Sequence, residues 1–540
     1  MHNFRALVAF AFFLSGCDTS ISPERPEAPS AETTRLEADL RFLADDILEG
    51  REAGTRGYDL AALYVAERFR ALGLEPGGVN GSFFQPVPLL EYEPGATASL
   101  TIGELEFASG EDYLTLPSGK GETIDVSAPL VFAGLCFASE RHDRDDFDGL
   151  DLEGKIAVCM SGAPKYLNSE EMAHFRSTQA QRLSEQGAIG MVGIWTESIE
   201  QIFPFERYTR MVNRGFSRMT WLDGDGAPFS SAPNIQAGSA LSLAGGEKLM
   251  SAVGQSWEEI LADTESDAGD VARFNLGLDA RIRIESKHRY LTSDNVVGIL
   301  PGSDPAFADD YVILLAHLDH IGIKPTPDEG DDEIYNGAMD NASGISALLE
   351  VARLLKSSPP KRSVLFLAVT AEEKGLNGSD YFARNPTVSA NRMVAVVNLD
   401  MPIMTYPFTD IIAFGAERST LYQPVLDAAE AHNLVLSPDP VPEEGIFTRS
   451  DHYMFVKQGV PAVYLKPGFA NGGEEEQTVF RETHYHEASD ETDLVDFDAL
   501  RRFTDVKADI ARNIANMPER PLWNAGDFFG TTFNGPVADE

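Results

Sequence analysis

The run YVILLAHLDH, residues 311–320, decides the fold class. Its apolar part, 311–316, has the length of a buried strand, and histidines and a carboxylate follow at once. Two further strand-length apolar runs cover 363–369 and 393–397, and apolar residues recur at helical spacing over 344–355. Strands that alternate with helices predict an α/β fold with a mostly parallel central sheet flanked by helices.

Residues 96–272 have a different texture, because short alternating segments are divided there by Gly, Asp and Ser. This texture predicts an inserted β-rich module. The chain, at 540 residues and 58.9 kDa, is also longer than one ordinary domain. We therefore expect a discontinuous α/β domain, residues 35–95 and 273–540, interrupted by a module at 96–272.

The charge is strongly acidic: 85 Asp and Glu against 43 Lys and Arg give a net charge of −42. Such a surface repels phosphate backbones, so nucleic acid is not an expected partner. Hydrophobic residues make up 43% and charged residues 24%, which is typical of a globular protein and argues against a disordered or polytopic membrane chain.

The first 17 residues resemble a bacterial lipoprotein signal, with a basic start, an apolar run over 6–14 and a Leu-Ser-Gly-Cys ending. Cys17 is the expected lipid attachment site; the alternative is a plain signal peptide with an incidental cysteine. Residues 18–34 are rich in Ser, Pro and Glu and are expected to form a tether. We expect an exported protein, held by its lipid alone to a bacterial membrane and facing the periplasm or the exterior.

Two cysteines remain, Cys136 and Cys159. An exported chain meets oxidising surroundings, so a disulfide between them is one interpretation. The other is a pair of buried free thiols on neighbouring strands. The residues alone leave both open.

Polar side chains follow each predicted strand of the α/β unit. His317 follows the first strand, Glu372 and Glu373 follow the second, and Asp400 follows the third. Ligands bind beyond the carboxyl ends of strands in open α/β sheets, so we expect these groups to meet at one edge.

A carboxylate before the predicted helix, Asp340, and a late imidazole, His486, extend this set. The candidate metal ligands are His317, Asp340, Glu373, Asp400 and His486. They suffice for two divalent ions that share one carboxylate, and two Zn²⁺ are favoured over Mn²⁺ or Co²⁺. Glu372 stays unligated and is the predicted general base. Structural alternatives exist for single residues, such as a helix N-cap role for Asp340.

Several stretches resemble the di-zinc exopeptidases, which include secreted bacterial aminopeptidases and the relatives of glutamate carboxypeptidase and the transferrin receptor. The matching stretches are residues 316–319, 340–344, 372–375, 398–400, 450–452 and 485–490. The likeness also covers residues 43–73, and it implies the zinc exopeptidase fold. More loosely, residues 96–272 resemble the protease-associated domain that some members carry as a lid or substrate-selecting wall.

The resemblance implies a role for each candidate ligand. His317 and Asp400 would hold one zinc ion, Glu373 and His486 the other, and Asp340 would bridge the two.

It also implies roles around the metals, with Glu372 as general base. Asp319 would orient His317, and Tyr485 would polarise the scissile carbonyl or stabilise the oxyanion, unless it is only a packed tyrosine. His320 and His484 are rival ligands, and His452 is expected to line the cleft or support a loop.

The function predicted from this pattern is a metal-dependent exopeptidase, an aminopeptidase acting on peptide substrates. Alternatives of the same fold are a carboxypeptidase, for which Arg449 is the candidate cation, a glutaminyl cyclase, and a metal-free receptor-like binding protein. The absence of Gly-x-Ser-x-Gly and His-Glu-x-x-His argues against a serine hydrolase and a single-zinc endopeptidase.

Overall fold

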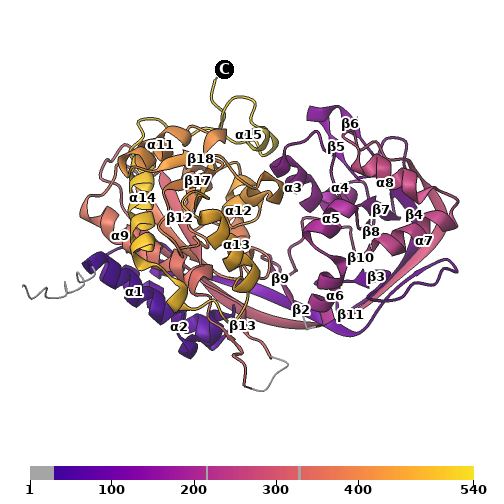
Figure 1. Cartoon of the computed structure of the whole chain (residues 1–540), viewed down its shortest axis with the longest axis horizontal. Helices are drawn as coiled ribbons and strands as arrows, with labels where there is room; N and C mark the ends of the chain where they lie inside the picture. The colour runs from indigo at the N-terminus through magenta and orange to yellow at the C-terminus, as the bar shows by residue number, and fades with distance from the viewer. Residues whose placement is uncertain (1–29, 214–216, 326–329, 540) are drawn as a thin grey trace, which may run out of the picture.

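The structure is a computed structural model and describes residues 30–213, 217–325 and 330–539. The predicted signal sequence, with Cys17, and residues 18–29 of the predicted tether lie outside these ranges. Residues 31–34, predicted as the end of the tether, instead begin a helix. Two lobes are joined by two long strands, β2 (Phe84–Ile102) and β11 (Arg273–Leu300) (Figure 1). None of the helices in the described ranges has the length and apolarity needed to cross a bilayer.

One lobe contains the predicted α/β unit. Its strands have the order β18-β17-β19-β16-β12-β15-β11 in the sheet. They are β12 (Tyr311–His317), β15 (Ser363–Val369), β16 (Met393–Asn398), β17 (Asp410–Phe414), β18 (Val435–Ser437) and β19 (Ala462–Pro467). β12 pairs in parallel with β15 and β16, and β16 with β19, whereas β11 is antiparallel to β15. The predicted α/β fold with a mostly parallel sheet is confirmed.

Both faces of this sheet are covered, as its unbroken apolar strands require. Along β12, Val312 and Leu314 belong to one core and Ile313 and Leu315 to the other, and all four are fully buried. Consecutive strand residues point to opposite faces, so each face needs its own helices.

The helices of this lobe divide between the two cores. The first core includes α1 (Ala31–Leu43), α2 (Arg56–Ala71), α9 (Ser343–Ser357), α11 (Tyr422–Ala431), α13 (Gly473–Thr483) and α14 (Phe497–Ala515). The second includes α10 (Asn377–Arg384), α12 (His452–Val456) and α15 (Phe528–Thr532). Short strands complete the lobe: β1 (Glu75–Pro76), β13 (Gly322–Ile323) and β14 (Ile334–Tyr335).

The other lobe extends the same sheet in the order β11-β4-β7-β8-β10-β3. Its strands are β3 (Tyr113–Thr115), β4 (Thr123–Ala133), β5 (Ala138–Ser139), β6 (Arg144–Asp145), β7 (Ile156–Met160), β8 (Gly190–Ile194), β9 (Arg218–Trp221) and β10 (Ala237–Leu241). Its helices are α3 (Ser169–Ser177), α4 (Gln179–Glu185), α5 (Glu197–Ile202), α6 (Phe205–Asn213), α7 (Leu243–Ala252) and α8 (Trp257–Glu265). The predicted β-rich module is thus mixed α/β, because helices pack beside its parallel strands.

Two features of the second lobe bear on the sequence predictions. Cys136 and Cys159 form a disulfide with Cα atoms 5.7 Å apart, so the first of the two interpretations is the one found. β2 runs through the predicted boundary between residues 95 and 96. The lobes therefore share a continuous sheet, and the exact domain limits stay a prediction.

Candidate active site and metal centre

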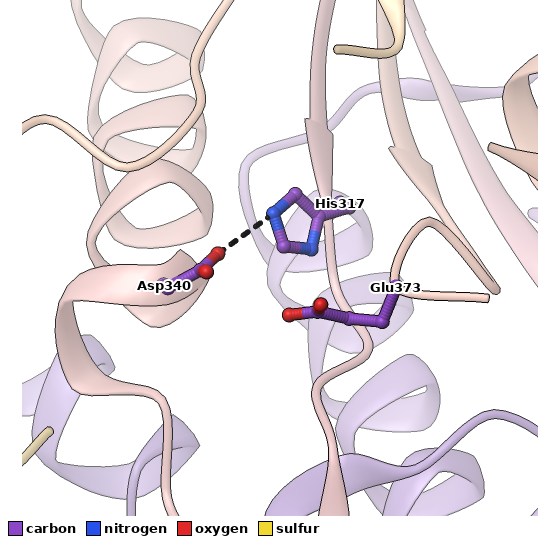
Figure 2. A group of neighbouring side chains, drawn as sticks. All are labelled: His317, Asp340 and Glu373. Carbon is purple, nitrogen blue, oxygen red and sulfur yellow. Dashed lines mark ion pairs between the residues drawn. The ribbon is translucent and has the colours of Figure 1, made fainter. Parts of the chain in front are cut away.

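Three neighbouring strand ends and one turn bring the candidate residues together. His317 ends β12, Glu373 follows β15 and Asp400 follows β16, and β12 lies between the other two strands in the sheet. Asp340 comes from the single turn at Ala338–Ala342 that leads into α9. In Figure 2 the side chains of His317, Asp340 and Glu373 point toward one shared space.

The Asp340 carboxylate lies between two imidazoles. Its Oδ1 is 3.0 Å from His317 Nε2 and its Oδ2 is 3.3 Å from His486 Nε2. His317 Nε2 also lies 3.3 Å from Asp400 Oδ1, and His486 Nε2 lies 3.0 Å from Glu373 Oε2. All five predicted ligands therefore meet, as two half-sites that share one carboxylate.

This donor set fits zinc. One ligand atom each from His317, Asp340 and Glu373 lies within 4.8 Å of the others, and His317 and Asp340 are buried. The donors are imidazole nitrogens and carboxylate oxygens, which zinc prefers together with thiolate.

The pKa shifts in the cluster also show that its buried carboxylates favour positive charge nearby. Burial acts to lower the pKa of His317, but Glu372, Asp340 and Asp400 outweigh it and raise this pKa well above its ordinary value. The pKa of His486 is raised in the same way, against burial, by Glu373 and Asp340. Buried carboxylates must be compensated, and protons or divalent cations can do so.

Glu372 lies beside this cluster and lines a cavity of about 340 Å³. Burial, with Glu373 and Asp451 nearby, raises its pKa well above the ordinary value even though His317 opposes the shift. A carboxylate with a raised pKa is suited to accept a proton and to pass it on.

The contact between Asp319 and His317 runs through the main chain. His317 Nδ1 lies 3.1 Å from the Asp319 carbonyl oxygen. The Asp319 carboxylate instead accepts hydrogen bonds from the backbone N–H groups of Glu372 and Glu373, at 3.1 and 3.3 Å. Its side chain therefore holds the loop that carries the predicted base.

Two carboxylate ligands have further supports that the sequence did not single out. Asp490 accepts from the backbone N–H groups of Met339 and Asp340, at 2.9 and 3.0 Å. The Ser450 hydroxyl donates to Asp400 Oδ2. Both supporting residues lie in stretches that carried the family resemblance, which was the available signal.

The remaining candidates take different places. His320 Nδ1 lies 2.7 Å from Glu373 Oε1, so this histidine supports a ligand. His484 contacts Ser489 through Nδ1 at 2.8 Å. Tyr485 stacks on His486, with ring centroids 3.9 Å apart, and lines the cavity.

His452 is fully buried, and its Nδ1 lies 3.3 Å from Asn398 Nδ2. Arg449 lines the cavity with 57% of its side chain exposed. All cavity-lining residues lie between positions 317 and 486, so no described residue of 96–272 forms part of this wall.

Comparison with known proteins identifies a family similar to part of the α/β lobe. Residues 295–511 match the model of peptidase family M28. The matched segment is similar to that family and spans less than half of the chain. It coincides with most of the α/β lobe and contains every candidate ligand.

Curated relatives resemble parts of the chain. Aminopeptidase Y of Saccharomyces cerevisiae is 28% identical over 245 residues, 43% of this chain and 41% of the relative. Aminopeptidase YwaD of Bacillus subtilis is 36% identical over 111 residues, 20% of this chain and 22% of the relative. A probable zinc metalloprotease of Pyrenophora teres is 35% identical over 106 residues, 20% and 22% of the two chains. These matches span less than half of the relatives' length.

A solved structure extends the likeness to both lobes. The aminopeptidase from Aneurinibacillus sp. strain AM-1 superimposes with a TM-score of 0.51 at 20% identity, covering 90% of this chain and 95% of that one. The shared feature is the fold.

Proposed function

We propose that this chain is an exported zinc aminopeptidase that removes N-terminal residues from peptides. The observation that carries the proposal is the shared Asp340 carboxylate, whose two oxygens face different imidazoles at 3.0 and 3.3 Å. The family match of residues 295–511 and the names of the relatives support the same activity.

Two zinc ions would occupy the half-sites, one held by His317 and Asp400 and the other by Glu373 and His486, with Asp340 shared. When bound, they would acidify a water molecule and polarise the scissile carbonyl.

Glu372 would take the proton from the attacking water and then give it to the leaving amine. Its place in the cavity wall and the two hydrogen bonds from its loop to Asp319 support this role. Tyr485 would donate from its hydroxyl to the oxygen of the former carbonyl, where negative charge develops. Its ring is positioned for this by stacking on His486.

Export and lipid anchorage at Cys17 belong to the same proposal. They rest on the Leu-Ser-Gly-Cys ending of the first 17 residues. The Cys136–Cys159 disulfide supports an oxidising location such as the periplasm or cell exterior. Radiolabelled palmitate would test the anchor: the wild type should be labelled and Cys17→Ser should not. Globomycin should make the unprocessed precursor of the wild type accumulate. A wild type without label would overturn the anchor.

A zinc titration of chelator-treated protein tests the enzyme function. Amino-acid arylamides with a free amine should be cleaved only after zinc is restored, whereas N-blocked arylamides should stay intact. Full activity without metal, or no activity on unblocked substrates with zinc bound, would overturn the proposal. The latter result together with an intact fold would favour the receptor-like alternative.

Carboxypeptidase activity is the second candidate, because Arg449, Lys466 and Arg481 all line the cavity. Release of C-terminal amino acids from N-blocked peptides would identify it. Formation of a cyclised product from N-terminal glutamine would instead identify the cyclase.

A further inference from the structure

One part of the cavity wall is cationic, although the chain as a whole carries a net charge of −42. Lys466 comes from β19, Arg481 from α13 and Arg449 from the turn before α12, and all three line the same cavity as the metal cluster. This concentration of cations beside the candidate metal centre is unexpected in so acidic a protein.

The arginines are partly compensated by one carboxylate. Glu444 lies 3.2 Å from Arg481 through Oε1 and 3.8 Å from Arg449 through Oε2. One carboxylate is thus shared by two guanidinium groups, and a positive charge is left over.

Lys466 has no such partner. In the described part of the chain its ammonium forms neither an ion pair nor a hydrogen bond, and it lies 5.4 Å from the ring centroid of Tyr464. Burial lowers its pKa, and the anions that oppose this shift are Asp400 and Asp340. Both are predicted zinc ligands, and bound metal would neutralise them. Lys466 would then face the cavity as a partly buried cation without a counter-charge, which is costly unless a ligand supplies one.

The rest of this wall is apolar and includes Ile403, Ile412, Phe414 and Phe469. An apolar wall alone would suit leucine-like side chains. A cation set into an apolar wall instead discriminates strongly, because a ligand without the matching charge leaves the ammonium unpaired.

We propose that Lys466, assisted by Arg481, binds a carboxylate of the peptide substrate, so that this site favours acidic substrates; the inference rests on the proposed peptidase function. Two sources supply such a carboxylate next to a scissile bond: the side chain of an N-terminal Asp or Glu, and the free C-terminus of a short peptide.

The first test compares kcat/KM for glutamyl and glutaminyl arylamides, which differ in charge but hardly in shape. The wild type should prefer the glutamyl substrate by about tenfold or more, and this ratio should fall as salt is added. Lys466→Gln should bring the ratio close to one. Arg481→Gln should lower it less, because Arg481 already pairs with Glu444. The exposed Lys361, changed to Gln as a matched control, should keep the wild-type ratio.

A second arm identifies the source of the carboxylate. If the site binds a C-terminus, Leu-Gly should be cleaved faster than its amide, and Lys466→Gln should remove that difference. A charge preference in either arm that depends on Lys466 supports the inference. Equal cleavage within both substrate pairs, or a preference that Lys466→Gln leaves unchanged, overturns it.

A binding measurement separates this inference from the proposed function. Calorimetry of zinc-loaded protein should show tighter binding of free L-glutamate than of L-glutamine, and Lys466→Gln should remove the difference. This result would stand even if no peptide were cleaved, in which case only the peptidase proposal would fail. Equal affinity for the two amino acids contradicts binding of a side-chain carboxylate, and the Leu-Gly pair then decides whether the site binds a C-terminal one.

Discussion

Asp340 is the residue on which both halves of the candidate centre depend. Its oxygens face His317 and His486, and its backbone N–H is fixed by Asp490. Glu372 has a different position, because it reaches the cavity without contacting either imidazole at ion-pair distance. A ligand and a base placed in this way should respond differently to substitution.

Glu372→Gln should lower kcat by about 10²- to 10⁴-fold while zinc content stays at the wild-type level, because the proton acceptor is removed and the ligands are kept. Asp340→Asn should lower both activity and zinc content. Metal analysis by mass spectrometry, alongside arylamide kinetics, checks the pair. Loss of zinc from Glu372→Gln would show that Glu372 is itself a ligand.

Asp490→Asn should weaken zinc binding by about 10- to 100-fold, because a neutral amide holds the amides of Met339 and Asp340 less firmly. Competition with a chromogenic chelator measures the affinity. Asp493→Asn is the control, since that side chain is 92% exposed and lies three residues away. Equal affinities of the two variants would rule out a supporting role for Asp490.

At this scale the sequence predicted which side chains come together. Four of the five candidates follow an apolar strand or precede a helix, whereas His486 came from the family resemblance. Their role as zinc ligands stays a prediction. The sequence did not predict the supporting roles of Ser450 and His320. Ser450 and His320 acquire their roles from contacts with Asp400 and Glu373, which are 50 and 53 positions away along the chain. Lys466 was missed for a similar reason, because only the folded cavity shows that its ammonium has no counter-charge.

Among the helices, α3 packs the second lobe against the first. Its His174 contacts the Tyr453 hydroxyl of α12 at 2.6 Å through Nδ1 and lies edge-on to Phe528 and Phe533. Burial lowers the pKa of His174 to about 3, and the cations Arg182 and Lys457 add to the shift. This neutral histidine makes the contact between the lobes sensitive to acid.

The direction of this effect follows from the pKa of His174, which is about 3 in the folded chain and 6.5 ordinarily, as in the unfolded chain. Above the ordinary value of 6.5 His174 is neutral in both the folded and unfolded chains, and its contribution to stability is complete. As the pH falls from 6.5 toward 3, only the unfolded chain takes up the proton, so stability is lost.

Thermal denaturation between pH 7 and about pH 4.5 should therefore show a smaller loss of stability for His174→Gln than for the wild type. Glutamine keeps a hydrogen-bonding group near Tyr453 but does not titrate. Parallel stability curves for the two proteins would contradict the assignment.

Helices and strands of the first lobe followed closely from periodicity. The helical spacing over 344–355 corresponds to α9 at Ser343–Ser357, and the apolar run over 363–369 is β15. The second lobe was harder to predict, because its helices are short and α5 (Glu197–Ile202) has no buried residue to mark a face.

For the molecule as a whole, the dominant feature is the net charge of −42, which makes the folded chain repel itself. Raising NaCl from about 0.02 M to about 0.5 M should increase the melting temperature, because a shorter Debye length screens that repulsion. Differential scanning calorimetry with sucrose of matched osmolality as the uncharged control measures the effect. A melting temperature that falls with salt would show that attractive ion pairs outweigh the repulsion.

β11 pairs with β15 at one end, with β4 at the other, and with β2 along most of its 28 residues. Neither lobe can be excised as a cassette, since any cut through this ribbon exposes a row of unpaired amides and carbonyls. A chimaera that exchanges the second lobe between related enzymes would fold only if β2 and β11 were exchanged together. A protease that cleaves surface loops would leave the two lobes attached to each other.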